Sequence, residues 1–210
     1  MRLVAVSKSC SALAVCEAVA AGQRDLGENY VQEALDKMAE VRARCAPPSG
    51  NLRWHMIGPI QSNKTRAIAE HFDWVHSVDR AKIAVRLSQQ RPAHLGPLNL
   101  CLQVNISGEA SKGGVAPAQL IELAFTVARL PGLRLCGLMA IPEPAARPEL
   151  AHAPMAAMAR LREAVRAAGL PCDELSMGMS DDLEAAIAEG ATMVRVGTAI
   201  FGKRAAAPAA

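Results

Sequence analysis

Strand-like and helix-like segments alternate along this chain, and that order constrains its fold more than any other feature of the sequence. Apolar runs that read as strands cover residues 3–8, 25–29, 52–58, 74–79, 97–105, 133–140, 173–179 and 193–201. Apolar residues at helical spacing predict helices over 11–21, 30–44, 61–71, 80–90, 117–130, 148–168 (beginning near Pro154) and 180–188. Each strand except the last is therefore followed by a helix. Such alternation is typical of parallel strands joined by right-handed crossovers.

The number of strand–helix units predicts an α/β fold, a closed (β/α)8 TIM barrel, with a single domain over residues 1–204. The run 97–105 is almost continuously apolar, as expected for a parallel strand buried on both faces. A doubly wound open sheet is the competing architecture for the same pattern. The Ala-rich residues 205–210 are expected to form a short frayed tail.

Composition argues against several classes of protein. The 23 basic and 20 acidic residues leave a net charge of +3, and aromatic residues make up 3%, so neither a basic surface nor a base-stacking platform for nucleic acid is expected. No run approaches the roughly 18 apolar residues of a membrane span. The 6 cysteines form no CxxC pair and no metal-ligand spacing, which favours reduced thiols in the cytoplasm and no metal site.

Functional groups of such barrels collect at the carboxyl ends of the strands, and Lys8 closes the first strand. Alternation places Val4, Val6 and Lys8 on one face, so Lys8 points into the barrel mouth if the two valines fill the interior. An amine that is removed from water has a lowered pKa and attacks aldehydes as a Schiff-base lysine. The alternative is a solvated lysine at a strand end.

The connections after the seventh and eighth strands predict an anion site, because these loops form the common phosphate site of such barrels. Gly178 and Gly197 allow close approach of the backbone, while Ser180 and Thr198 offer hydroxyl donors. The alternative interpretation is a pair of ordinary tight connections, with Ser180 as a helix cap.

Arg195 lies between two valines on a strand that should be buried on both faces. A buried guanidinium needs a partner, which is either a ring nitrogen or carboxylate of a ligand or an internal salt bridge. A lysine for an aldehyde, a cradle for a phosphate and an arginine for a ring nitrogen together describe pyridoxal 5′-phosphate (PLP). Because arginine donates but does not readily release a proton, the pyridine would stay unprotonated and be a weak electron sink.

Six motifs occur in order along the chain and carry a specific resemblance. They are LVAVSK (3–8), GENYVQE (27–33), WHMIGPIQSNK (54–64), GLMA (137–140), LSMGMSDD (175–182) and VRVGTAIFG (194–202). With these motifs the chain resembles the pyridoxal phosphate homeostasis proteins, the YggS/PROSC family, from Leu3 to Gly202.

The resemblance implies a fold-type III PLP barrel similar to the N-terminal domain of alanine racemase. By that likeness PLP would be held as a covalent aldimine on Lys8, Arg195 would face the pyridine nitrogen, and Asn29 and His55 would line the ring pocket. The other implied cofactor-binding residues lie in the last two loops and are Met179, Ser180, Gly197 and Thr198, the last three holding the phosphate.

The resemblance also implies a protein that is not an enzyme. It would buffer PLP and deliver it to apo-enzymes, as a monomer, with neither a membrane nor nucleic acid as a partner. Two alternatives stay open. A PLP-dependent racemase or decarboxylase is one, although racemisation needs a second base on the opposite face of the substrate, and Tyr30 is the only tyrosine. A Schiff-base aldolase, the other, would use Lys8 on a phosphorylated sugar without PLP.

The segment 107–114, with Lys112 among its glycines, is either a mobile lid over the site or an ordinary loop. The chain departs from the family pattern in two places. The helix that usually precedes the first strand is missing, which puts the covering of the barrel bottom in doubt. The usual aromatic residue is absent near Ala153 within 147–158, and we expect this to affect packing and not the cofactor site.

Overall fold

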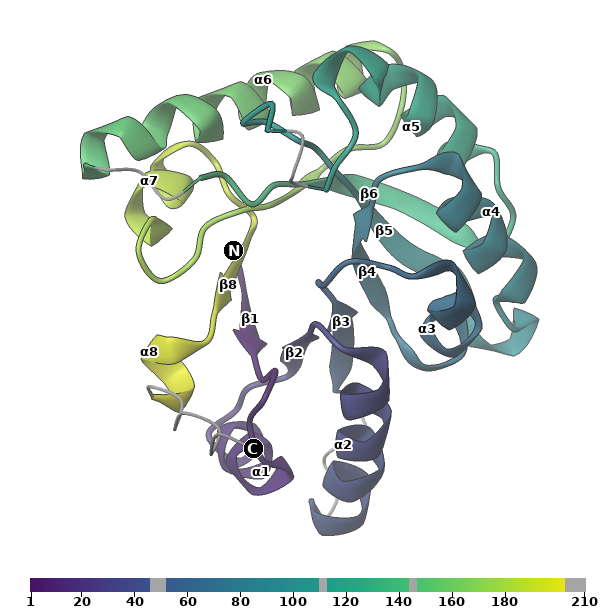
Figure 1. Ribbon diagram of the computed structural model, residues 1–210, viewed down its shortest axis with the longest axis vertical. Coiled ribbons are helices and arrows are strands. Elements are labelled where there is room, and N and C mark those ends of the chain that lie inside the picture. Colours follow the sequence, from purple (N-terminus) through teal and green to yellow (C-terminus); the bar gives the residue numbers. More distant parts are fainter. Residues whose placement is uncertain (46–51, 110–112, 144–146, 203–210) are drawn as a thin grey trace.

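A closed barrel of parallel strands forms the centre of the protein. The computed structural model describes residues 1–45, 52–109, 113–143 and 147–202. Within these ranges the strands pair in chain order, and the first pairs with the last, so the sheet has no open edge. Helices surround the strands as an outer ring (Figure 1). This arrangement confirms the predicted (β/α)8 barrel and excludes the open doubly wound sheet.

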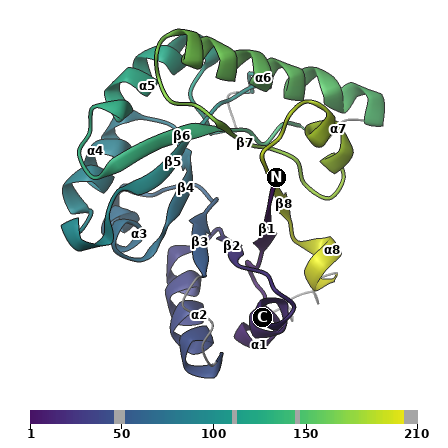
Figure 2. The same cartoon turned by 180° about the vertical axis from the view of Figure 1, so that it is seen from behind.

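The elements follow one another as strand and helix throughout. The strands are β1 (Arg2–Val6), β2 (Asp25–Glu28), β3 (Arg53–Met56), β4 (Trp74–Val78), β5 (Leu98–Gln103), β6 (Leu133–Met139), β7 (Glu174–Ser176) and β8 (Met193–Val196). The α-helices are α1 (Ala12–Ala20), α2 (Val31–Arg44), α3 (Thr65–His71), α4 (Ala81–Gln90), α5 (Leu120–Ala128), α6 (His152–Ala167), α7 (Leu183–Ala188) and α8 (Thr198–Phe201). Figure 2, seen from behind, shows β7 between β6 and β8.

Two predicted boundaries are wrong. The eighth strand ends earlier than predicted, and the seventh helix begins later. The run 193–201 is a strand only as far as Val196, after which Thr198–Phe201 turns into α8. Helix α7 begins at Leu183 and not at residue 180, because the Asp182 carboxylate accepts the backbone N–H of Met179 and closes a turn first. The first difference shortens β8 and adds a short helix directly after it, and the second lengthens the connection between β7 and α7.

Side chains alternate between the two faces of the barrel wall. Outward residues such as Leu26, Val75 and Leu100 belong to the main hydrophobic core, which the strands share with the helices. Four inward residues from four different strands form a second cluster inside the barrel, namely Trp74, Cys101, Met139 and Met193. The interior is thus filled by side chains, as expected for a barrel of this size.

Strand β1 follows the predicted alternation. Ala5 belongs to the outer core, whereas Val4 faces Gly27 on the inner side, where a Cβ on that glycine would lie 3.0 Å from Val4 Cγ1. Pairing with β2 continues past the end of β1, because the Ser7 N–H donates to the Gly27 carbonyl at 3.0 Å. Lys8 therefore lies at the carboxyl end of β1, on the same face as Val4 if the alternation continues.

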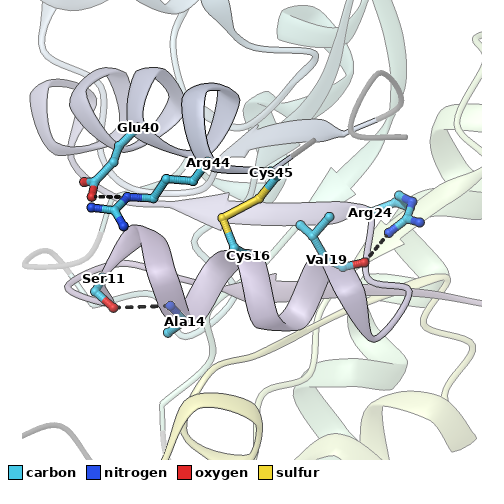
Figure 3. Close-up of a disulfide and its surroundings, with 8 residues drawn as sticks. All are labelled: Ser11, Ala14, Cys16, Val19, Arg24, Glu40, Arg44 and Cys45. Carbon is cyan, nitrogen blue, oxygen red and sulfur yellow. Dashed lines mark hydrogen bonds and ion pairs between the residues drawn. A yellow bond between two sulfur atoms is a disulfide. The ribbon is translucent and has the colours of Figure 1, made fainter. Parts of the chain in front are cut away.

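A disulfide joins Cys16 to Cys45, whereas the sequence predicts reduced thiols throughout. Cys16 lies within α1 and Cys45 ends α2, with 29 residues of sequence separation and 5.9 Å between the two Cα atoms (Figure 3). Because this contact arises from the packing of α1 against α2, no local cysteine spacing signals it. Closing a loop of this length is worth roughly 3–4 kcal/mol in the chain-entropy account.

The described part of the chain contains no helix that is both long enough and apolar enough to cross a bilayer. In the same residues, no three His, Cys, Asp or Glu side chains are grouped so that they could hold a metal ion. The predicted tail, 205–210, and the centre of the predicted lid, residues 110–112, lie outside the described ranges.

Cys16→Ser removes the α1–α2 disulfide and is expected to lower the thermal unfolding temperature by roughly 6–16 °C, because the unfolded chain regains the freedom of the closed loop. Thermal unfolding with and without dithiothreitol measures the effect. Reductant should lower the transition of the wild type and leave that of Cys16→Ser where it is. Equal transitions for both proteins in the absence of reductant would show that the bond contributes nothing.

Candidate functional site

The carboxyl ends of β1, β7 and β8 meet at one end of the barrel. Strand β1 pairs with β8 so that Val4 lies opposite Arg195. The Arg195 N–H in turn donates to the Gly178 carbonyl at 2.9 Å, which ties the loop after β7 to β8. Lys8, the loop containing Gly178 and the buried Arg195 therefore lie on neighbouring strands around one mouth. The structure thus brings together three groups that the sequence places far apart.

A buried ion cluster holds the backbone just before Lys8, which is itself half-buried. Lys37 Nζ, from α2, donates to the Ser7 carbonyl at 2.6 Å and to Glu28 Oε1 at 2.8 Å. The same carboxylate oxygen accepts the Ser7 hydroxyl at 2.6 Å. Glu28 is fully buried, and burial raises its pKa although the hydrogen bond from Lys37 works against this. The peptide entering Lys8 is therefore fixed by two charged side chains.

The backbone just after Lys8 is held by the same cluster. The Ser9 N–H donates to the Glu33 carboxylate, which also accepts from Lys37 Nζ at 2.9 Å. Ser9 has a φ of 60°, the left-handed conformation that residues other than glycine seldom adopt. These contacts fix the point from which the Lys8 side chain leaves the chain.

Arg195 lies inside the barrel wall with only 4% of its surface exposed. Nη1 donates to Ser176 Oγ at 2.8 Å, and Nη2 donates to the Ala140 carbonyl at 2.9 Å. Burial lowers the pKa of Arg195 to about 10, so the guanidinium still carries its charge at neutral pH. No carboxylate in the described residues forms an ion pair with it, so the internal salt bridge considered from the sequence is not formed. The buried charge is left with neutral acceptors only.

His55 lies below the mouth, within the barrel interior, and is fully buried. Its Nε2 is 2.9 Å from Asp25 Oδ1, its Nδ1 is 2.9 Å from His76 Nε2, and its ring stacks on Trp74. Burial lowers the pKa of His55 and holds that of His76 well below the usual value. Because both ring nitrogens are engaged, His55 has no polar atom left for a ligand ring. That His55 lines the ring pocket stays a prediction, and its full burial favours an indirect part over a direct contact.

Asn29 stands at the mouth, half-buried, directly after β2. The chain after β3 packs against its backbone so closely that a Cβ on Gly58 would overlap Asn29. That close approach explains why the motif around Gly58 requires glycine, and it fixes where Asn29 sits relative to β3.

The two loops expected to bind phosphate are shaped by their glycines. Gly178 has a φ of +92°, and a Cβ there would come within 2.6 Å of the Ala186 methyl group. A Cβ on Gly197 would lie 3.2 Å from the Val6 carbonyl oxygen, which brings the β8 loop close to β1. The side chains that these loops present are Met179, which is half-buried, and Ser180 and Thr198, which are exposed.

A hollow of about 440 Å³ lies between the β7–α7 connection and the start of α6. Its lining includes Ser180 together with the carboxylates of Asp181, Asp182 and Glu184. Such a lining repels a phosphate. An anion bound by Ser180 would therefore approach it from the side of β8.

Several residues of this arrangement were not singled out by the sequence reasoning, because polar side chains on strands and helices give no spacing signal. Two of them, Glu28 and Glu33, lie inside a motif that carries the family resemblance, and that motif was the available signal. Ser7 and Ser176 lie inside two other quoted motifs, 3–8 and 175–182. The roles of Asp25, Lys37 and His76 came from the fold alone.

Comparison with known proteins gives one consistent answer. The family described as "Alanine racemase, N-terminal domain" matches residues 1–205. The chain is 65% identical over 202 residues to the "Pyridoxal phosphate homeostasis protein" of Pseudomonas aeruginosa, which covers 96% of this chain and 84% of that protein. It is 55% identical over 207 residues to the protein of the same name from Escherichia coli, with coverage of 96% and 85%.

Among solved structures, PipY of Synechococcus elongatus with PLP bound matches with a TM-score of 0.86 and 41% identity. The match covers 96% of this chain and 92% of PipY. An alanine racemase from Clostridium difficile matches with a TM-score of 0.75 at 12% identity, which shows the fold alone.

The free energy of unfolding is expected to decrease as the pH falls from 7 to 5, because of His55 and His76. Their pKa values are lowered in the folded protein, so below pH 6.5 the unfolded chain binds protons that the folded chain does not. Each histidine kept neutral contributes up to about 1.4 kcal/mol per pH unit. Denaturant titrations at several pH values measure the slope.

His76→Gln should reduce that slope by about one proton, whereas His94→Gln, at an exposed position, should leave it unchanged. A wild-type slope that both variants reproduce would show that His76 is not kept neutral by the fold.

Proposed function

The chain belongs to the pyridoxal phosphate homeostasis proteins, within the alanine racemase N-terminal domain family, and from this premise we propose that it binds PLP at the barrel mouth and keeps its free level in balance. Relatives at 48–65% identity carry that name, and PipY has been solved with PLP bound. The residues around the mouth fit each part of the cofactor.

The observation that carries this proposal is the buried guanidinium of Arg195 without a carboxylate partner. Its terminal nitrogens each carry two N–H groups, and the protein uses Ser176 Oγ and the Ala140 carbonyl as acceptors. A buried charge with only neutral partners is costly unless a further acceptor is supplied. A pyridine nitrogen at the mouth supplies one, and Arg195 would keep it unprotonated because it donates without losing a proton.

Lys8 is proposed to hold the aldehyde of PLP as a Schiff base. Its amine, in the neutral form, adds to the aldehyde carbon, and one water leaves as the C=N bond forms. The clamp of Lys37, Glu28 and Glu33 on the flanking peptides reduces the freedom that Lys8 would otherwise lose on binding. PLP itself would supply the electrophilic aldehyde and the ring that receives the Arg195 hydrogen bond.

The phosphate is proposed to lie between the loops that follow β7 and β8. Ser180 and Thr198 expose their hydroxyls there, and Gly197 lets the backbone come close. Met179 and Asn29 would flank the cofactor from either side of the mouth, since both are half-buried at strand ends. His55 is placed beneath the cofactor and out of contact with it.

We propose no catalytic role for the bound cofactor. Racemisation at a substrate carbon needs acid or base groups on both faces, and Lys8 would provide one. Tyr30, the only tyrosine of the sequence, is 60% exposed at the start of α2. An unprotonated pyridine would also stabilise a carbanion poorly.

The partners follow from this role. Apo-forms of PLP-dependent enzymes would receive the cofactor, which places the protein with them in the cytoplasm. The Cys16–Cys45 disulfide does not itself argue for that compartment, where thiols are normally reduced.

A monomer is proposed because the exposed large apolar side chains are scattered over different elements, as with Leu13, Phe125 and Ile187. The lid over 107–114 remains a proposal as well.

Incubation with PLP is expected to give a yellow protein whose visible absorption band disappears on reduction with borohydride. Lys8→Ala should take up no cofactor with that band, because Lys8 carries the amine that is proposed to form the Schiff base. Lys82→Ala, at an exposed lysine of α4, should behave as the wild type. A colourless wild type that cannot be loaded with PLP, yet cleaves or condenses phosphorylated sugars through Lys8, would establish the aldolase instead.

The purified PLP-bound protein is expected to racemise or decarboxylate amino acids no faster than free PLP does. Chiral chromatography and carbon dioxide release measure the two reactions. Turnover at 1 s⁻¹ or more, which is on the order of ordinary enzyme rates, would replace the carrier role by an enzymatic one.

A further inference from the structure

Five polar side chains from five strands form one hydrogen-bonded chain through the barrel interior. It begins at Arg195 Nη1, 2.8 Å from Ser176 Oγ, and continues over 2.7 Å from Ser176 to His76 Nδ1. His76 Nε2 lies 2.9 Å from His55 Nδ1, and His55 Nε2 lies 2.9 Å from Asp25 Oδ1. All five are buried. The chain thus runs from β8 through the interior to β2, the two strands that flank β1 in the closed barrel.

With both histidines neutral, as their lowered pKa values favour, only one arrangement of protons satisfies the whole chain. The Asp25 carboxylate can only accept, so His55 Nε2 carries a proton and donates it. With His55 neutral, its Nδ1 accepts from the protonated Nε2 of His76. His76 Nδ1 then accepts from the Ser176 hydroxyl, whose oxygen accepts from Arg195. Every donor therefore points away from Arg195 and toward Asp25.

The two ends of the chain carry opposite charges. Asp25 is held ionised by two hydrogen bonds from Arg53, at 2.7 and 2.6 Å, as well as by His55, and its pKa is lowered to about 2. In the described residues Arg195 forms no ion pair with a carboxylate, although the charge of Asp182 raises its pKa, and the anion to which its hydrogen bonds lead is Asp25. Aligned hydrogen bonds polarise one another in a medium of low dielectric constant.

Alternative orientations of the guanidinium are blocked by this chain. Ser176 holds Nη1 and the Ala140 carbonyl holds Nη2, so two points define the plane of the Arg195 side chain. The Ser176 hydroxyl could rotate if it were not tied to His76, and His76 could change tautomer if His55 were not tied to Asp25. The chain therefore removes the freedom of each link in turn.

We propose that Ser176, His76, His55 and Asp25 are positioning residues that hold Arg195 in one orientation toward the ring of bound PLP. This inference rests on the proposed function. It makes retention of the cofactor depend on Asp25, at the start of β2, which would not touch the cofactor. In this proposal His55 acts on the cofactor indirectly, by holding His76 and through it Ser176 and Arg195.

The chain itself is tested in the protein without PLP. Long-range ¹H–¹⁵N NMR should show both His55 and His76 as neutral rings protonated at Nε2 at pH 7. A His76 protonated at Nδ1 could not accept from Ser176, and that result would overturn the inference whether or not PLP binds. This measurement needs no variant and no cofactor.

The effect on PLP is tested with Ser176→Ala, which breaks the chain beside Arg195, and Asp25→Asn, which removes the negative charge at its far end. Each should weaken PLP binding about tenfold or more and move the visible absorption maximum, because the charge near the ring is no longer fixed. Cys101→Ala is the matched control, since Cys101 is an inward, fully buried residue outside the chain. It should bind PLP with the wild-type affinity and absorption maximum.

The outcomes separate the two proposals. Folded Ser176→Ala and Asp25→Asn proteins with wild-type affinity and spectrum would overturn the positioning role while leaving PLP binding intact. An equal change in Cys101→Ala would also overturn it, by showing that any loss of interior packing has this effect. Failure of the wild type to take up PLP would contradict the proposed function, and the NMR result would still decide whether the chain exists. Circular dichroism identifies a variant that does not fold, and the other variant then carries the comparison.

Discussion

Closing the sheet into a barrel buries the inward side chains of all eight strands in one dry interior, and the guanidinium of Arg195 is the most demanding of them. A charge in that position is stable only if hydrogen bonds and opposite charge reach it. The fold supplies neutral acceptors at close range, brings the charge of Asp182 near enough to raise the pKa of Arg195, and connects Arg195 by hydrogen bonds to the Asp25 carboxylate through Ser176 and two histidines. Much of the polar interior follows from this one constraint, including the neutral state of both imidazoles. The same constraint leaves the guanidinium able to accept a partner from outside.

The backbone around Lys8 is held from the outside of the barrel wall, whereas Arg195 is held from the inside. Its neighbours Ser7 and Ser9 are held by a lysine and two glutamates that lie between β1, β2 and α2, on the helix side of the wall. The mouth is thus supported by two separate polar systems, one behind the lysine and one inside the barrel. Both place charge near a site whose cofactor carries an aldehyde, a ring nitrogen and a phosphate. The charged groups at the mouth match the chemical groups of PLP, and close relatives are named for PLP homeostasis. The proposed function therefore rests on the residues of this chain as well as on its family.

The sequence predicts the barrel because hydrophobic periodicity is a local property that each segment displays by itself. It misplaces the end of β8, since residues 197–201 are as apolar as the strand before them, and only the close contact of Gly197 with β1 turns the chain into α8. Lys8, Arg195 and the glycine loops are predictable from strand ends and from the motifs. The roles of Lys37, His76 and Asp25 are not, because each depends on contacts 9 to 100 residues away along the chain. For the same reason the Cys16–Cys45 pair and the burial of His55 emerge only from the packed structure.

The central claim is that the amine of Lys8 carries the cofactor beside the buried Arg195. Borohydride reduction of the PLP-loaded protein, followed by proteolysis and peptide mass spectrometry, identifies the lysine that bears the pyridoxyl group. The account predicts a single modified peptide, the one that contains Lys8. A pyridoxyl group found chiefly on Lys37, Lys64 or a surface lysine such as Lys82, with Lys8 unmodified, would contradict it.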